Sequence, residues 1–244
     1  MEDIAPVLAA DINKRFDAAV KSDSVIKQLA LKLNKGPLGT GDIRTLSVRL
    51  GGHASDALRA VLTPEALPDG RVYWNIAERT IKPVLTQIYQ VENALMYNSL
   101  SAADKAAGIN IAIKQGGDPA DRIKEVMDFA TNSRTAEEIS NALNDPVKTT
   151  AIDFTDDFIK ENAELRDKLG FKQVITREYD GVGLAGGKVQ CNWCVGRAGT
   201  YYSYKEAYDA GAFERHTGCG CTITWDTSDE VENEDFSTST AVPF

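Results

Sequence analysis

The sequence CNWCVGRAGTYYSYKEAYDAGAFERHTGCGCTITW, from Cys191 to Trp225, decides how the rest of the chain is interpreted. It holds all 4 cysteines of the chain and one of its 2 histidines. Two close groups of thiols separated by a short insert are typical of a four-coordinate zinc site. The candidate metal ligands are Cys191, Cys194, His216, Cys219 and Cys221.

These five candidates compete for four places. One of them, His216 or one of Cys219 and Cys221, is therefore expected to lie outside the direct coordination sphere. The other interpretations of the pattern are disulfides, free thiols or a redox pair. A redox pair requires the Cys-x-x-Cys motif to open a helix within a βαβ unit, and the sequence does not predict one. A thiolate-rich site without an open position favours a structural zinc ion over a catalytic one, because metal binding stabilises a segment too small to bury a core of its own.

The insert between the two cysteine groups predicts a short helix. Ser203-x-x-Glu206 has the pattern of a capping box, so a helix from Tyr204 to about Ala210 should end at Gly211. The segment is dense in aromatic residues, which suggests either the core of a small zinc module or a base-stacking surface for nucleic acid. Residues 181–244 carry 4 Lys+Arg against 9 Asp+Glu, a net charge of −5, and this favours the core.

Several motifs in residues 155–225 resemble the C-terminal module of the phage minor head proteins, the Mu F-like head-morphogenesis group of tailed phages. Members usually carry Arg between the last two cysteines, where this chain has Gly220. The motifs that carry the resemblance are Cys191-x-Trp193-Cys194, Ala198-Gly199-Thr200-Tyr201, Arg215-His216-x-x-Cys219-x-Cys221, Asn162-Ala163-Glu164-Leu165-Arg166 and Val174-Ile175-Thr176-Arg177.

The resemblance implies a structural protein of the virion, present in few copies inside the head near the portal. It implies contact with the portal protein, the major capsid protein or both, and proximity to packaged DNA. Such a protein is made in the cytoplasm of the bacterial host and acts in head assembly. A further role in the packaging or ejection of DNA is compatible with this location. The alternative function is that of a zinc-ribbon-like nucleic-acid-binding protein acting on phage DNA.

Apolar periodicity and cap signals, among them the capping box Thr135-x-x-Glu138, predict that residues 1–170 are entirely helical. The sequence is therefore expected to form a mainly α protein, with a helical N-terminal body, a small C-terminal α+β zinc-binding module at 171–225 and an acidic, Ser/Thr-rich tail at 226–244. Helix breaks are expected at Ser22-Asp23-Ser24, Gly51-Gly52, Pro83 (a kink or restart), Ser101 and Asp145-Pro146, and the last helix should run to Leu169.

Two strands are predicted after this body, within Phe171–Tyr179 and Cys221–Trp225, paired antiparallel over the zinc site. Between them lies the pattern Gly181-x-Gly183-x-x-Gly186, which matches a dinucleotide-binding fingerprint. No βαβ unit surrounds it, so a flexible hairpin loop is the better interpretation. The tail should be disordered unless Val242-Pro243-Phe244 anchors it.

Composition and missing motifs exclude several functions. A net charge of −9 and a pI near 4.9 argue against a dedicated DNA-binding protein. The sequence predicts no membrane span and no secretion signal. It shows no Ser/His/Asp or Cys/His triad and no phosphate-binding loop, so no catalytic residue, small-molecule substrate or cofactor other than zinc is expected. The isolated His53 is expected at the end of an element rather than in a metal site.

Overall fold

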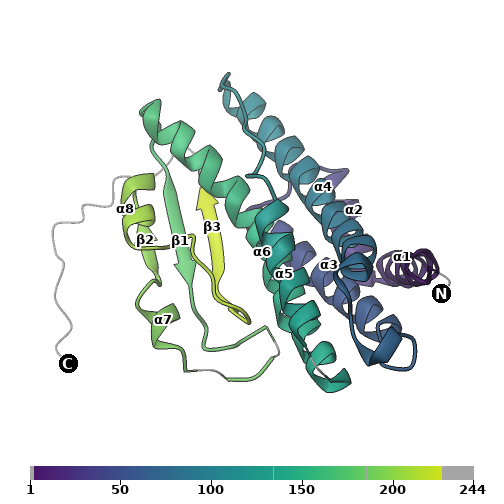
Figure 1. Ribbon diagram of the computed structural model, residues 1–244. Helices are drawn as coiled ribbons and strands as arrows, with labels where there is room; N and C mark the ends of the chain where they lie inside the picture. Colours follow the sequence, from purple (N-terminus) through teal and green to yellow (C-terminus); the bar gives the residue numbers. More distant parts are fainter. Residues whose placement is uncertain (1–2, 134, 185, 189, 227–244) are drawn as a thin grey trace.

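The computed structural model describes residues 3–133, 135–184, 186–188 and 190–226. It is mainly helical, with a small sheet near the C-terminus, as the sequence predicts (Figure 1). The elements in order are α1 Ala5–Ser22, α2 Ser24–Leu33, α3 Thr40–Val61, η1 Pro68–Gly70, α4 Trp74–Ala107, α5 Ala120–Asn132, α6 Ala136–Lys168, β1 Val174–Glu178, α7 Asn192–Val195, β2 Gly199–Tyr201, α8 Tyr204–Asp209 and β3 Thr222–Asp226.

Side-chain caps begin several helices where the sequence predicts them. Asp23 separates α1 from α2 and accepts hydrogen bonds from the backbone N–H groups of Val25 (2.8 Å) and Ile26 (3.1 Å). At the start of α6, Thr135 and Glu138 form the reciprocal capping box. Each cap satisfies backbone donors that the first turn of a helix leaves without partners.

The predicted break at Gly51-Gly52 is wrong, because α3 continues through both glycines. A Cβ atom added at Gly51 would lie 3.0 Å from the Cβ of Ala151 and 3.0 Å from the Cα of Lys148, both on α6. The missing side chain therefore allows α3 and α6 to pack with their backbones close together. Tertiary packing offsets the cost of glycine within a helix, which is about 1 kcal/mol.

Of the two alternatives predicted at Pro83, a kink or a restart, the restart is wrong, and so are the restarts predicted at Ser101 and Asp145-Pro146. Helix α4 is continuous through the first two positions, and α6 is continuous through Pro146. Each proline removes one backbone donor. The apolar stripe nevertheless runs past Pro146 without a break, since Ile139, Leu143 and Val147 are all fully buried. Burial along the whole helix face decides these boundaries, and the local cap signal does not.

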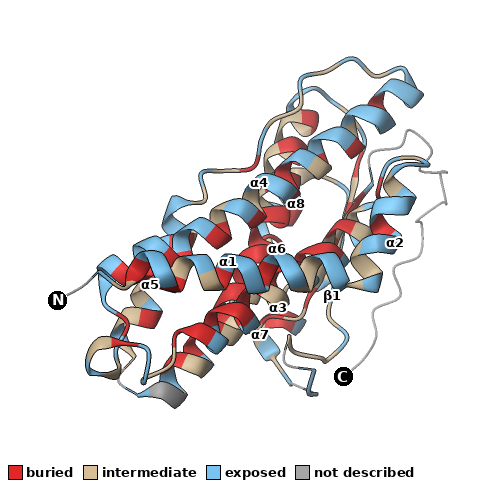
Figure 2. Cartoon of the chain, turned by 90° about the vertical axis from the view of Figure 1, so that its right-hand side faces the viewer, coloured by how far each residue is buried: buried red, intermediate tan, exposed pale blue. Residues whose placement is uncertain are grey.

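Buried residues concentrate where α1, α3, α4 and α6 face one another (Figure 2). A second apolar cluster joins the C-terminal half of α6 to the sheet and α8. In it Ile159 and Ala163 of α6 pack with Ile175 of β1 and with Ile223 and Trp225 of β3. Helix α6 therefore belongs to both cores and connects the helical body to the C-terminal module.

The sheet has the order β2-β1-β3, and all pairs are antiparallel. The predicted pairing of the first and last strands is confirmed, with Ile175 opposite Trp225 and Arg177 opposite Ile223. The short β2 was not expected from the sequence. The cysteines lie at one end of the strands, next to the Glu178–Thr222 pair, while the apolar face of the sheet packs with α6 and α8.

A buried ion pair holds the far end of the module. Arg166 of α6 donates to both carboxylate oxygens of Asp104 on α4, at 2.6 and 2.7 Å. Its guanidinium lies 5.3 Å from the ring centroid of Trp225, and the indole N–H donates to the side-chain oxygen of Gln173 at 2.9 Å. One arginine thus links α4, α6 and β3.

The expectations for the tail beyond Asp226, including the anchor at 242–244, fall outside the described residues. Among the described helices, none combines the length and the apolarity that crossing a membrane requires.

Glu92 of α4 is completely buried, and burial raises the pKa of its carboxyl well above 4.5. The charge of Asp156 adds to this increase, and neither carboxylate oxygen of Glu92 has a hydrogen-bond partner among the described residues. Above pH 4.5 the unfolded chain releases this proton while the folded chain retains it, so Glu92 opposes folding increasingly as the pH rises.

We expect Glu92→Gln to increase the free energy of unfolding by more at pH 7 than at pH 4, by up to about 1.4 kcal/mol for each pH unit above the unfolded pKa. Urea denaturation at both pH values measures this. The control is Glu78→Gln on the same helix, whose carboxylate is 53% exposed and should show little pH-dependent change. An equal effect of Glu92→Gln at both pH values would contradict the prediction.

Candidate metal centre

The four cysteines and His216 gather at one end of the sheet. Cys191 immediately precedes α7 and Cys194 lies within it, so the first turn of that helix presents both sulfurs to the same side. His216, Cys219 and Cys221 follow on the segment that leads into β3. The five side chains form two overlapping groups, Cys191–Cys194–His216 and Cys194–Cys219–Cys221, in each of which the donor atoms lie within 4.8 Å of one another.

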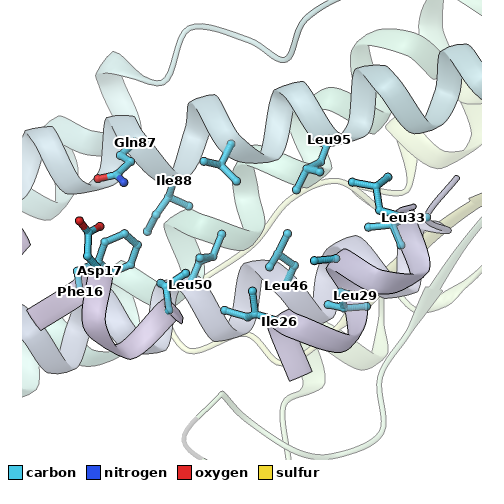
Figure 3. A pocket seen from close by; sticks show the side chains of 14 residues that line it. Phe16, Asp17, Ile26, Leu29, Leu33, Leu46, Leu50, Gln87, Ile88 and Leu95 are labelled. Atoms are coloured by element: carbon cyan, nitrogen blue, oxygen red, sulfur yellow. The ribbon is translucent and has the colours of Figure 1, made fainter. Parts of the chain in front are cut away.

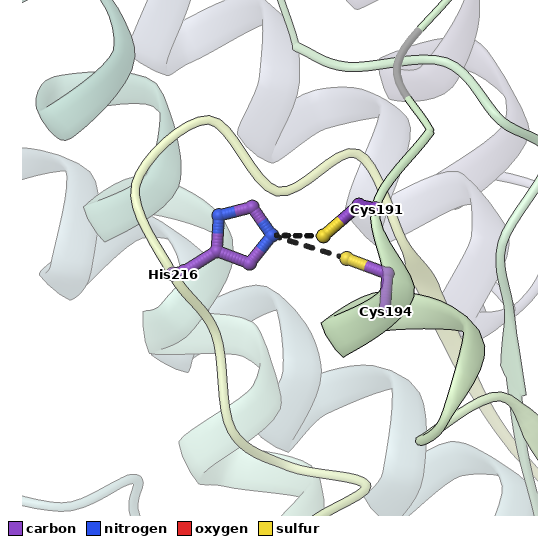
Figure 4. Close-up of side chains that lie close together, drawn as sticks. All are labelled: Cys191, Cys194 and His216. Atoms are coloured by element: carbon purple, nitrogen blue, oxygen red, sulfur yellow. Dashed lines mark hydrogen bonds between the residues drawn. The ribbon is translucent and has the colours of Figure 1, made fainter.

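Cys194 belongs to both groups. Its Sγ lies 3.1 Å from Nε2 of His216, and Sγ of Cys191 lies 3.3 Å from the same nitrogen (Figure 4). The Sγ of Cys194 also lies 3.7 Å from Sγ of Cys219. A tetrahedral zinc ion with Zn–S bonds of about 2.3 Å and Zn–N bonds of about 2.0 Å separates its ligand atoms by about 3.5–3.8 Å. These three separations lie near this spacing, so the cluster could hold a metal ion.

The imidazole of His216 is oriented for coordination. Nδ1 lies 2.8 Å from the carbonyl oxygen of Thr217, to which it donates a proton in the tautomer that leaves the Nε2 lone pair directed at the thiols. The edge of the ring meets Trp193, with the centroids 5.2 Å apart and the planes at 90°. Backbone and aromatic contacts therefore fix the ring before a metal binds.

The thiols differ in their affinity for protons. The pKa of Cys219 is lowered to about 4, first because Cys221 donates a hydrogen bond to it and then because Arg215 and Arg177 lie close. Burial raises the pKa of Cys194 to about 11, and the hydrogen bond to Cys219 raises that of Cys221. The two arginines therefore favour a thiolate in the Cys219–Cys221 pair, and a cation bound there would replace protons on the neighbouring thiols.

Two buried arginines surround Cys219. Arg177 and Arg215 each place a guanidinium nitrogen 3.6 Å from its sulfur. Arg177 also donates to the carbonyl of Ala212 at 2.7 Å, and Arg215 donates to the carbonyl of Cys221 at 2.8 Å. These arginines hold the backbone on both sides of the cysteine pair, as well as the sulfur itself.

Arg215 and Arg44 attach the segment that carries Cys219 and Cys221 to the helical body. Arg215 forms a buried ion pair with Asp156 of α6. From α3, Arg44 donates to the carbonyl of Gly220 at 2.6 Å and to the hydroxyl of Thr222 at 2.8 Å. Burial and the nearby Arg215 lower the pKa of Arg44 to about 10. Sequence reasoning did not find Arg44 or Asp156, because both contact the cysteine segment from helices far away in the chain.

The glycine-rich loop forms a hairpin rather than a nucleotide site. Val182 and Lys188 form an antiparallel bridge, and no helix opens at the loop within the described residues. The hairpin packs on the cysteine segment, where the Leu184 N–H donates to the Gly218 carbonyl at 3.2 Å. A Cβ added at Gly220 would lie 1.9 Å from the Val182 carbonyl oxygen. The hairpin therefore occupies the space that an arginine at position 220, as in the resembling family, would need.

The other singled-out residues have structural contacts. His53 lies within α3 rather than at the end of an element, because α3 continues through Gly51-Gly52. Its Nε2 lies 2.8 Å from the carboxylate of Asp23, the cap of α2. Tyr204 packs against the second apolar core, whereas Tyr202 and Tyr208 are exposed. The predicted cap at Ser203 is confirmed, since its hydroxyl accepts the Glu206 N–H at 3.2 Å.

Comparisons of the chain with protein-family models, with curated proteins and with solved structures found no match.

We expect Gly220→Ala to destabilise the module, because a Cβ at this position must displace the backbone of the 182–188 hairpin. Overpacking of this kind typically costs about 1–3 kcal/mol. Thermal denaturation measures the loss. Gly187→Ala in the same hairpin is the matched control, since a Cβ there meets nothing within 4 Å. Equal melting temperatures for the two variants would contradict the close contact.

Proposed function

We propose that this chain is a structural minor head protein of a tailed bacteriophage, located inside the head near the portal. The observation that carries the proposal is the metal cluster, built from the motif that resembles the Mu F-like group and attached by buried arginines to a long helical body. Residues of that motif have interlocking structural roles: Trp193 packs on His216, Arg215 binds α6, and the Tyr201 hydroxyl donates to the Arg197 carbonyl at 2.9 Å.

The chemistry of the cluster also fits a metal ion with a structural role. Cys194, Cys219 and Cys221 are buried, and the donors are mainly thiolates, which favour zinc in a closed site. We assign Cys191, Cys194, His216 and Cys219 as the four zinc ligands and place Cys221 outside the coordination sphere. Cys219 is preferred because its sulfur lies 3.7 Å from that of Cys194, near a tetrahedral spacing, and because guanidinium nitrogens of Arg177 and Arg215 lie 3.6 Å from it.

The purified chain should contain about one zinc ion by the four-ligand rule, measured by elemental analysis. Cys219→Ser should weaken zinc binding by at least about tenfold in a competition titration with a chelator, whereas Cys221→Ser should change it by less. Removal of zinc should lower the melting temperature. Zinc loss from Cys221→Ser with retention by Cys219→Ser would reverse the assignment, and the absence of zinc with an unchanged melt would overturn the site.

A specific observation also favours the second candidate, a zinc-ribbon-like nucleic-acid-binding protein. Trp193 lies under the guanidinium of Arg197, 3.9 Å from the ring centroid, and Tyr202 and Tyr208 are exposed on the same module. Exposed aromatic side chains are a common feature of surfaces on which bases stack. Against this, Arg197 is also paired with Glu214 at 3.1 Å, and the net charge of the chain is −9.

Quantitative mass spectrometry of purified virions tests the proposed location. Peptides of this chain should be present at a few copies per particle, in constant ratio to the portal protein and far below the major capsid protein. Absence from virions would overturn the proposal. The second candidate is tested separately with single-stranded and double-stranded DNA: binding that weakens steeply with salt and is lost in Trp193→Ala and Tyr202→Ala would favour it.

A further inference from the structure

An apolar cavity of about 190 Å³ lies between α2 and the helices beneath it. Its walls include Phe16 of α1, Leu29 and Leu33 of α2, Leu46 of α3 and Ile88 of α4, whose side chains point into a common space (Figure 3). At roughly 30 Å³ per water-sized unit, the space holds roughly six non-hydrogen atoms. The cavity therefore has the size of a large aliphatic side chain together with part of a neighbouring one.

The cavity opens at the protein surface. Val91 on its rim is 40% exposed. Asp17 and Gln87 lie together at one end, and Asp17 is the ionisable residue among the described residues that line the cavity (Figure 3). An occupant that places an aliphatic side chain in the cavity and a cation near Asp17 would match both its apolar lining and its charge.

The outer face of α2 presents such a side chain. Leu31 is 62% exposed, and Lys27 lies one helical turn before it on the same face. Lys32 and Lys35 add positive charge nearby. Helix α2 therefore forms one wall of the apolar cavity that Asp17 borders. Its outer face carries the exposed Leu31 beside Lys27.

We propose that the chain forms a two-fold symmetric dimer through α2, in which Leu31 of each copy enters the cavity of the other and Lys27 approaches Asp17. A two-fold interface uses the same patch on both partners. Because α2 carries both the protruding Leu31 and one wall of the cavity, the two copies can exchange the same contact. The helix is already held in place at both ends. Asp23 contacts His53 at 2.8 Å and Arg49 at 3.6 Å, and Lys32 pairs with Asp42 at 2.5 Å. The proposal depends on neither the metal site nor the proposed location in the phage head.

Sedimentation equilibrium of the full chain, with reductant present to exclude disulfides, tests the proposal. We expect a concentration-dependent monomer–dimer equilibrium. Leu31→Glu and Val91→Glu should each raise the dissociation constant by at least about tenfold, because each places a charge in the apolar contact. Leu31→Met should retain the dimer. Val7→Glu is the control, since Val7 is 72% exposed on α1 and does not line the cavity.

A charge exchange tests the orientation. Asp17→Lys should weaken the dimer about threefold by repulsion from Lys27, and the double variant Asp17→Lys, Lys27→Asp should restore it. All variants are exposed substitutions, and circular dichroism confirms that each remains folded. A monomer at every concentration would overturn the proposal. A dimer that responds equally to Leu31→Glu, Val91→Glu and Val7→Glu would do the same, because its interface would lie elsewhere.

Discussion

The arrangement of the C-terminal module depends on the buried guanidinium of Arg215. It pairs with Asp156 on α6, donates to the carbonyl of Cys221 and approaches the sulfur of Cys219. Its side chain is fully buried, so loss of the Asp156 carboxylate would leave the guanidinium with the more distant Asp153, at 3.9 Å, as its nearest carboxylate and would cost several kcal/mol. The segment that carries Cys219 and Cys221, the strand β3 that follows it and helix α6 are thereby fixed relative to one another. Asp156 lies before the predicted domain boundary at residue 170 and Arg215 lies after it, so this ion pair connects the helical body to the C-terminal module.

The packing of α3 against α6 also explains why these helices continue through residues that would weaken or interrupt an isolated helix. Gly51 would weaken an isolated helix, yet in α3 it permits close packing on α6, the helix that carries Asp156. Pro146 lies within an uninterrupted buried stripe. Local sequence preferences amount to about 1 kcal/mol for glycine and about 3 kcal/mol for proline, whereas burial of each large aliphatic side chain contributes about 1.5–3 kcal/mol. Several such side chains along one face outweigh one unfavourable residue.

These magnitudes explain which features the sequence could predict. Caps at Asp23, Thr135 and Ser203 were predictable because each uses residues within one turn. The five metal donors were predictable as a set because their spacing is local to two short segments. Helix continuity at Gly51, the contact of Arg44 with Gly220 and the fit of the hairpin on Gly220 depend on residues far apart in the chain. One signal was available but unused: Arg177 stands at an inward-facing position of a strand, where alternation would place an apolar residue.

Arg177 also bears on the composition of the metal site. It is buried, and its guanidinium contacts backbone carbonyls and the sulfur of Cys219. Carbonyl dipoles solvate a cation but do not neutralise it, so the balancing negative charge must come from the thiolates. A zinc ion with three thiolates and a neutral imidazole carries a net charge of −1, which one arginine balances. Four thiolates without the histidine would carry −2. Arg215 is already paired to Asp156, so the charge of the thiolates would be balanced by Arg177, which contacts Cys219, and by Arg44, which donates to the carbonyl of Gly220.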